Sequence, residues 1–142
     1  MDKYNSEGYP DPTAAEALEN VMREEKAKKY KPCVFICSPF AGDTARNLEN
    51  ARRYLKFAVE QGAIPFAPHL LYPQVMDDCD PDQRKLGLFF GMVWLRKCDE
   101  LWVFGSYISA GMQAEIDKAS KHRIPIRYFT EKCEEHSCNE EI

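Results

Sequence analysis

The stretch that most constrains the fold runs from Cys98 to Ala119. It begins with a short apolar segment, Glu100–Phe104, continues through a loop rich in glycine and serine, and ends in a segment with helical periodicity. Short apolar runs bounded by turn residues are typical of buried strands in parallel sheets. The stretch therefore predicts a strand, a loop and a helix. Ligands of open α/β sheets bind where such loops follow the carboxyl ends of strands.

Glu115 stands out in the predicted helix. Met112, Ile116 and Ala119 recur at spacings of four and three and form an apolar stripe, and Glu115 lies on that stripe. A carboxylate turned toward a sheet is expected to be paired, hydrogen-bonded or functional. The alternative is a glutamate at the edge of the stripe with its head group in water. Spacing alone leaves both interpretations open.

The same stretch resembles the nucleoside 2-deoxyribosyltransferase superfamily, and within it the DUF4406-like group of small bacterial and phage domains. The resemblance covers about residues 33–128, most of the chain. It is carried by motifs that fall in the same order, Cys98-Asp99 and Ser109-x-Gly111-Met112-x-x-Glu115-Ile116-x-x-Ala119.

The resemblance implies a reaction and roles for three residues. Glu115 would be the nucleophile that attacks the anomeric carbon of a sugar, and Asp99 would assist it. The transferases carry an aspartate at the position of Ser109, whereas the related deoxynucleoside monophosphate N-glycosidases carry a serine that contacts the 5′-phosphate. The chain is therefore expected to cleave the C1′–N bond of a nucleotide or nucleoside, by hydrolysis or by transfer, without a metal or an organic cofactor. The second hypothesis is a non-catalytic nucleotide-binding module, a sensor or sponge on the same fold.

A second strand–loop–helix unit begins at Cys33–Cys37, and Asp43 or Thr44 can cap its helix. Such a unit binds phosphate or ribose, and in the resembled family its loop surrounds the nucleotide. The chain lacks the arginine and the first-strand tyrosine of those enzymes, and Arg46 is the expected substitute for the arginine. The residues predicted to bind the substrate are Cys37, Ser38, Pro39, Phe40, Gly42, Arg46, His69, Ser109, Gly111 and Met112.

Three groups of polar residues have alternative interpretations. The acidic run 77–82 is explained more simply as the charge complement of a helix N-terminus, with Pro81 in the first turn, than as a metal site. His69 follows the predicted strand Ala63–Ala67 and is either a loop or capping residue or a peripheral part of the site. Cys133, His136 and Cys138 lack a second pair of ligands, so no zinc site is expected there.

The helix predicted over Asp82–Lys97 is apolar on two faces. A helix that is hydrophobic nearly all round is covered twice. One cover is the sheet, and the other is expected to be a second subunit, which predicts a homodimer or a higher symmetric oligomer. The N-terminal segment is the alternative cover. The two apolar stripes are Leu86, Phe89, Phe90 and Val93 on one side and Leu88, Met92 and Leu95 on the other, with Trp94 between them.

Strands that alternate with helices predict an α/β fold, a flavodoxin- or Rossmann-like three-layer sandwich with a four- or five-stranded parallel sheet. The last strand is Ile126–Phe129, and a charged helix, Thr13–Lys29, precedes the domain. The expected division is residues 1–30 as an arm and helix, 31–130 as the deoxyribosyltransferase-like domain, and 131–142 as a frayed acidic tail.

The composition narrows the partners to small molecules and further copies of the chain. A net charge of −4 argues against nucleic-acid binding, which needs a basic face. No apolar run is long enough to span a membrane, and no signal sequence is recognised. The expectation is a cytoplasmic protein with reduced cysteines.

Overall fold

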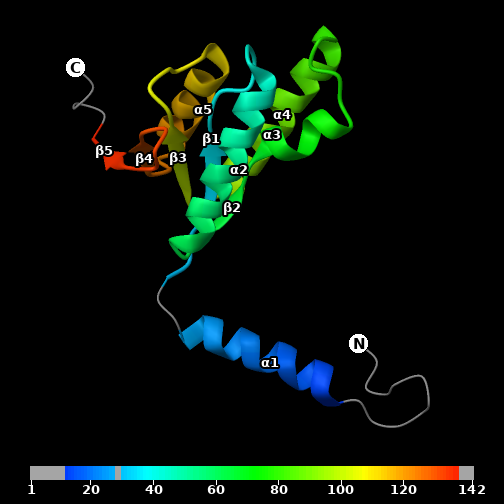
Figure 1. Ribbon diagram of the computed structural model, residues 1–142, viewed down its shortest axis with the longest axis vertical. Coiled ribbons are helices and arrows are strands. Elements are labelled where there is room, and N and C mark those ends of the chain that lie inside the picture. Colours follow the sequence, from blue (N-terminus) through cyan, green and yellow to red (C-terminus); the bar gives the residue numbers. More distant parts are fainter. Residues whose placement is uncertain (1–11, 28–29, 138–142) are drawn as a thin grey trace. The chain divides into compact units, whose positions relative to one another are not determined.

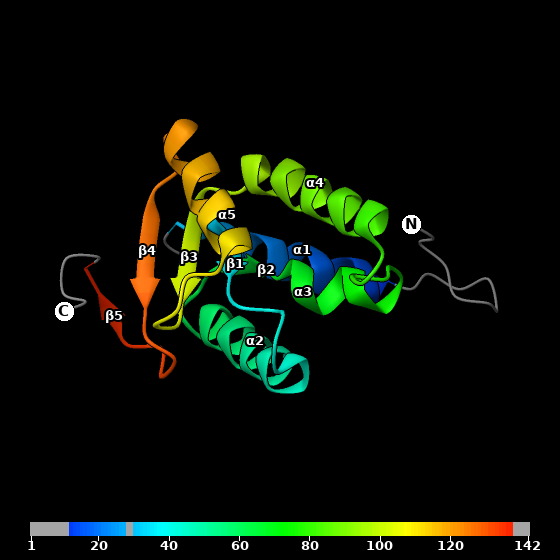
Figure 2. The same ribbon diagram turned by 90° about the horizontal axis from the view of Figure 1, so that it is seen from above.

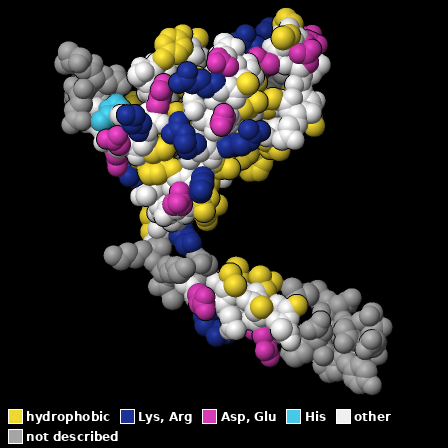
Figure 3. Space-filling model, viewed as in Figure 1, with side chains coloured by type: hydrophobic (Ala, Val, Ile, Leu, Met, Phe, Trp, Pro, Cys, Tyr) yellow, Lys and Arg dark blue, Asp and Glu magenta, His cyan; other side chains and the backbone are white. Residues whose placement is uncertain are grey.

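A computed structural model describes residues 12–27 and 30–137. The chain divides into two units, Met1–Tyr30 and Lys31–Ile142. The described helix of the first unit is α1 (Pro12–Ala27). The irregular arm predicted before it lies outside the described residues, apart from Pro12. Hydrophobic side chains gather along one side of α1 (Figure 3), and its exposed large apolar residues are Leu18, Val21 and Met22.

A five-stranded sheet forms the centre of the second unit (Figure 1). Neighbouring strands pair in parallel except for the last, which runs antiparallel to β4. This arrangement confirms the predicted α/β flavodoxin-like fold. In spatial order the strands are β2 (Ile64–Phe66), β1 (Cys33–Cys37), β3 (Glu100–Phe104), β4 (Ile126–Phe129) and β5 (Glu135–His136).

Helices cover both faces of this sheet. Figure 2 shows α2 (Thr44–Glu60) on one face, and α4 (Pro81–Lys97) with α5 (Ala110–Lys121) on the other. Two short helical segments follow β2, the helix α3 (Pro68–Leu71) and the 3₁₀ turn η1 (Tyr72–Gln74). His69 therefore lies in a short helix rather than in a loop.

The alternation of side chains along the strands explains the two layers. Because paired residues of neighbouring parallel strands point to the same face, Ile36 and Trp102 join the apolar cluster under α2. Phe35 and Leu101, one residue earlier in each strand, join the cluster that contains the buried residues of α4 and α5. The α5 members of that second cluster are Met112, Ile116 and Ala119.

Asp43 caps α2, which is one of the two predicted possibilities, and Asp80 of the acidic run caps α4. The Asp43 side chain accepts a hydrogen bond from the backbone N of Arg46 (3.3 Å), and Asp80 accepts one from the backbone N of Asp82 (3.0 Å), with Pro81 at the first helical position. The acidic run thus caps the N-terminus of α4 and places a negative charge in its first turn. Among residues 12–27 and 30–137, no group of three or more metal-ligating side chains is positioned to hold an ion.

The prediction of a frayed tail is wrong for Glu135–His136, which forms β5. The Arg127 guanidinium on β4 donates to both carboxylate oxygens of Glu135 (2.8 and 2.7 Å) and lies over the ring of Trp102. A bidentate pair of this kind fixes the edge strand better than two separate charges would. Cys138 lies outside the described residues.

The helix α4 shows which of its two apolar stripes faces inward. Gly91 and Leu95 are buried and Met92 packs beside them, whereas Leu86, Phe89 and Val93 are exposed. Of the outer stripe, Phe90 packs against Tyr72, and Leu86, Phe89 and Val93 are left exposed within the described second unit. No helix in the described part of the chain is both long and apolar enough to cross a membrane.

Candidate active site

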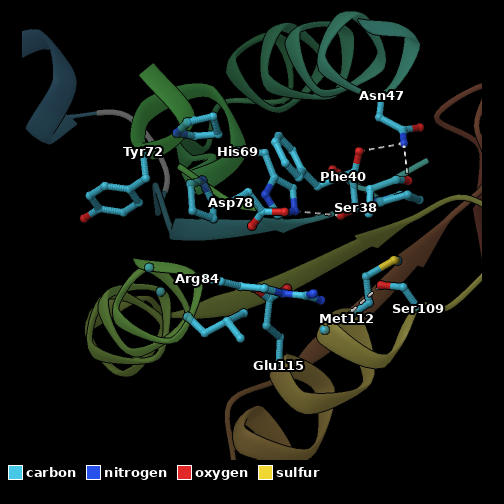
Figure 4. A pocket seen from close by; sticks show the side chains of 18 of the residues that line it. Ser38, Phe40, Asn47, His69, Tyr72, Asp78, Arg84, Ser109, Met112 and Glu115 are labelled. Carbon is cyan, nitrogen blue, oxygen red and sulfur yellow. Dashed lines mark hydrogen bonds between the residues drawn. The ribbon is translucent and has the colours of Figure 1, made fainter. Parts of the chain in front are cut away.

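A cleft of about 630 Å³ opens at the carboxyl edge of the sheet. Its walls come from the loop after β1, from α3 and η1 after β2, from the loop after β3, and from one face of α4. This is the position at which open α/β folds bind ligands, and the volume suits a small organic molecule. Figure 4 shows side chains from these separate elements pointing into the same space.

Glu115 forms part of the floor of this cleft (Figure 4). Its residue is only 7% exposed, so the alternative with the head group in water is excluded. Burial raises the pKa of Glu115 to about 7, and a hydrogen bond from the Cys37 side chain opposes that rise. Among the described residues no cation forms an ion pair with it. The carboxyl group is thus poised to change its charge near neutral pH.

Cys37 lies beneath the cleft rather than in its wall. The residue is completely buried at the end of β1, and its Sγ is 3.8 Å from the carbonyl oxygen of Met112. Burial raises the pKa of the Cys37 thiol well above its usual range, and the nearby Glu115 raises it further. The thiol therefore stays protonated and has two acceptors within reach, the Met112 carbonyl and the Glu115 carboxylate.

The loop after β1 forms one wall and is held from two sides. The Asn47 side chain of α2 donates to the carbonyl oxygens of Phe40 (3.0 Å) and Ala41 (3.1 Å). His69 Nε2 lies 2.9 Å from the carbonyl oxygen of Ser38, and its ring contacts the ring of Phe40 at a centroid distance of 5.0 Å. These contacts give the wall a fixed shape before any ligand binds.

His69 is a neutral hydrogen-bonding group in this setting. Burial lowers its pKa, which the hydrogen bond to Ser38 and the charge of Asp78 only partly offset. Because the Ser38 carbonyl can only accept, Nε2 carries the proton and Nδ1 is left as an acceptor. His69 can therefore position a ligand, but it is poorly suited to donate a proton.

Ser38 supplies an unused polar group. The residue is 1% exposed, it lines the cleft, and its hydroxyl has no hydrogen-bond partner among the described residues. A buried hydroxyl without a partner is costly. A polar atom of a ligand in the cleft would satisfy it.

The N-terminus of α5 forms the opposite wall. Ser109 caps the helix, with its Oγ accepting from the backbone N of Met112 (3.2 Å), and both Ser109 and Gly111 line the cleft. The free amides of a first helical turn favour an anion or a hydroxyl group of a ligand. Gly105, at φ +102°, allows the chain to turn sharply between β3 and this loop.

Two of the residues predicted for the site are placed elsewhere. Asp99 precedes β3, so it lies at the amino edge of the sheet, where its Oδ2 accepts a hydrogen bond from the backbone N of Cys33 (2.8 Å). Arg46 is exposed in the first turn of α2 and does not line the cleft. Neither residue therefore lies at the cleft.

The remaining predicted residues line the cleft, except for Cys37 beneath it: Ser38, Pro39, Phe40, Gly42, His69, Ser109, Gly111, Met112 and Glu115. Sequence reasoning missed a wall on α4 and several residues around it. Arg84, Gly87, Leu88 and Gly91 are spaced along one face of that helix, and Arg84 points into the cleft in Figure 4. The sequence feature that could have indicated this wall is the pair of glycines, Gly87 and Gly91, inside an otherwise apolar helix. Other missed lining residues are Asn47, Tyr72, Asp78, Tyr107 and Glu131.

Tyr72 is held in place by α4. The indole Nε1 of Trp94 donates to the Tyr72 hydroxyl (2.7 Å), and the Trp94 ring stacks on Phe66 of β2. The half-exposed Trp94 therefore supports the cleft from outside.

Comparison with known proteins agrees with this architecture. No curated protein sequence matches the chain. The fold is similar to that of a 2-deoxyribosyltransferase from the psychrotolerant bacterium Bacillus psychrosaccharolyticus, with a TM-score of 0.58 and 14% sequence identity over 69% of this chain and 72% of that one. At this identity the likeness concerns the fold alone. Residues 32–129 match the family described as a domain of unknown function, DUF7768. The chain belongs to that family, and its sheet and helices follow the fold of a 2-deoxyribosyltransferase.

Proposed function

We propose that the chain cleaves the C1′–N bond of a nucleoside or nucleotide, as an N-glycosidase or a 2-deoxyribosyltransferase, with Glu115 as the nucleophile. The observation that carries the proposal is the position of Glu115, a buried carboxyl group on the floor of a preformed cleft that has no ion-pair partner among the described residues. The motif around Glu115 resembles that of the deoxyribosyltransferases, and the fold is similar to that of one of them. Membership of the DUF4406-like group within that superfamily is also part of the proposal.

The chemistry follows from what such a carboxylate does to a sugar. Glycosidic cleavage passes through a sugar ring with oxocarbenium character, which a carboxylate next to C1′ stabilises and then captures as an ester. The C1′–N electron pair leaves with the base, which takes up a proton from the solvent, and the attacking water or second base later gives up a proton to the solvent. Water then attacks C1′ in hydrolysis, or a second base does so in transfer, and either step releases Glu115 as a carboxylate.

The other lining residues would hold the substrate in the required orientation. The unpartnered Ser38 hydroxyl and the amides at the start of α5 are suited to the sugar hydroxyls or to a 5′-phosphate. Arg84 adds a cationic group from the wall formed by α4. Phe40 and His69 offer a tilted pair of rings against which a flat base can pack.

Free base is the product that tests the proposal. Purified protein is incubated with deoxyribo- and ribonucleosides and their 5′-monophosphates, with and without a second base, and the products are separated by chromatography. Release of a base supports hydrolysis, and a new nucleoside supports transfer. Binding of nucleotides without any product would replace the proposal by the non-catalytic sensor or sponge.

We further propose that the protein is a homodimer or a higher symmetric oligomer built in part on α4. The exposed stripe of Leu86, Phe89 and Val93 is an apolar surface of the kind that oligomers bury. Leu88 lines the cleft and Met92 packs against the core, so neither position is suitable for a test of assembly. Phe89→Glu is expected to reduce the mass in light scattering to that of a monomer. A wild-type protein that is monomeric at micromolar concentration would contradict the proposal.

A further inference from the structure

The cleft-facing side of α4 has an unusual composition. Arg84, Gly87, Leu88 and Gly91 follow one another at helical spacing and all line the cleft. Each glycine inside a helix costs up to about 1 kcal/mol relative to alanine. The helix thus carries two unfavourable residues on the one face that borders the cleft.

Packing does not require a glycine at position 91. A Cβ built on Gly91 would lie 3.8 Å from Cζ of Phe35 and 4.0 Å from Oε2 of Glu115, which are ordinary van der Waals distances. The residue lies within a regular helix, without a positive φ. Neither a close approach of backbones nor a special conformation explains this glycine.

The neighbour of the missing side chain is the residue that bears the proposed chemistry. Of the glycines in the described residues, Gly91 is the one whose added Cβ would meet a carboxylate oxygen. Glu115 is itself more than nine-tenths buried, lines the same cleft and has no ion-pair partner among the described residues. The space kept free by Gly91 therefore lies beside a carboxylate oxygen of a buried acid whose one side-chain hydrogen-bond donor among the described residues is the Cys37 thiol.

We propose that Gly91 determines access to Glu115: the absence of its side chain keeps open the volume beside Oε2 into which the pentose ring of the substrate must move. The identity of the ligand in this statement rests on the proposed function. To form an ester with Oε2, the C1′ atom must approach far closer than the 4.0 Å at which an alanine methyl group would stand. A methyl group at position 91 would occupy the approach of the sugar while leaving the fold intact.

The test compares Gly91→Ala with Gly87→Ala. Both variants add one methyl group to the same face of α4, but a Cβ at position 87 meets only the flexible end of Met76, at 3.9 Å. Gly91→Ala is expected to lower kcat/KM for base release at least a hundredfold, and at least tenfold more than Gly87→Ala, because Gly87 also lines the cleft but does not border Glu115. Both should melt at or above the wild-type temperature, because alanine is the better helix former. Wild-type activity in Gly91→Ala, an equal loss in both variants, or a lower melting temperature for Gly91→Ala would each overturn the proposal.

A second readout does not depend on the reaction. A methyl group beside Oε2 displaces water, which disfavours the charged carboxylate, so the pKa of Glu115 measured by NMR on ¹³C-labelled glutamate should rise in Gly91→Ala. Gly87→Ala should move it less. An unchanged pKa in Gly91→Ala would overturn the role of Gly91 even if no substrate were found. A wild-type protein without activity on any nucleoside or nucleotide, but with this pKa response, would instead refute the proposed function and leave the access role in place.

Discussion

The two edges of the sheet use carboxylates in opposite ways. At the amino edge, Asp99 accepts a hydrogen bond from the backbone of Cys33 and joins the starts of β1 and β3. At the carboxyl edge, Glu115 is buried on an apolar helix face, and its charged form is disfavoured. The comparison shows that a carboxylate that accepts a backbone hydrogen bond supports the fold. A buried carboxylate without such a donor is left available for chemistry.

The largest effect should follow from neutralising the acid at the carboxyl edge. Glu115→Gln keeps the shape of the side chain and removes its negative charge, so base release is expected to fall by a factor of about a thousand or more. Nucleotide binding, measured by calorimetry, should change far less. A variant that keeps more than a tenth of the wild-type turnover would remove Glu115 from the role of nucleophile.

The same variant should reveal the cost of burying Glu115 in the folded protein. Because the folded-state pKa is raised from 4.5 to about 7, the stability that this group contributes is fully present below pH 4.5 and is lost as the pH rises through 7. At about 1.4 kcal/mol for each tenfold change in acidity, the loss approaches about 3 kcal/mol. The glutamine side chain of Glu115→Gln does not titrate, so the stability of this variant lacks that dependence on pH.

Thermal melts at several pH values check this prediction. Glu115→Gln should be more stable than the wild type at pH 8, by about 10 °C, and the difference should shrink toward pH 5. A difference that does not vary with pH would mean that Glu115 titrates in its ordinary range.

At the amino edge the expected effect is on stability alone. Asp99→Ala leaves the half-buried start of β1 without the acceptor for the backbone N of Cys33, which should lower the free energy of unfolding by about 1 kcal/mol. Its kcat for base release should stay within twofold of the wild type, as measured well below the melting temperature. A large loss of kcat at unchanged stability would return Asp99 to the active site and break the contrast between the edges.

The smallest effect concerns the cap of α5. Ser109→Asp retains an N-cap acceptor but adds a charge beside the first-turn amides. Affinity for a 5′-monophosphate is expected to fall about tenfold, or about 1.4 kcal/mol, relative to that for the matching nucleoside. Equal changes for the two ligands, measured by calorimetry, would place the phosphate away from Ser109.

Periodicity was sufficient to predict the layers of this fold. Three of the four parallel strands coincide with the predicted ranges, because short apolar runs between turn residues have few other interpretations. The strand β5 was missed because it contains two polar residues and is fixed by the Arg127–Glu135 pair, a contact between side chains eight positions apart.

A site residue could be predicted from the sequence only where its position relative to the end of a strand determines whether it lies at the cleft. Ser38, Ser109 and Glu115 follow the carboxyl ends of strands or begin the next helix, so topology places them together. Asp99 precedes its strand, and the same topology places it at the far edge. The wall on α4 depends on how that helix lies against the sheet, which periodicity does not specify for a helix apolar on two sides.

Trapping a glycosyl intermediate tests the central claim most directly. A nucleoside carrying fluorine at C2′ destabilises the oxocarbenium-like transition states and slows the release of a sugar ester. We predict that wild-type protein incubated with such a nucleoside gains the mass of one fluoropentosyl group, that peptide mapping places the group on Glu115, and that Glu115→Gln gains nothing. A label on another side chain would contradict the account. So would a wild-type protein that releases the base from both the fluorinated and the unfluorinated nucleoside but never carries a label.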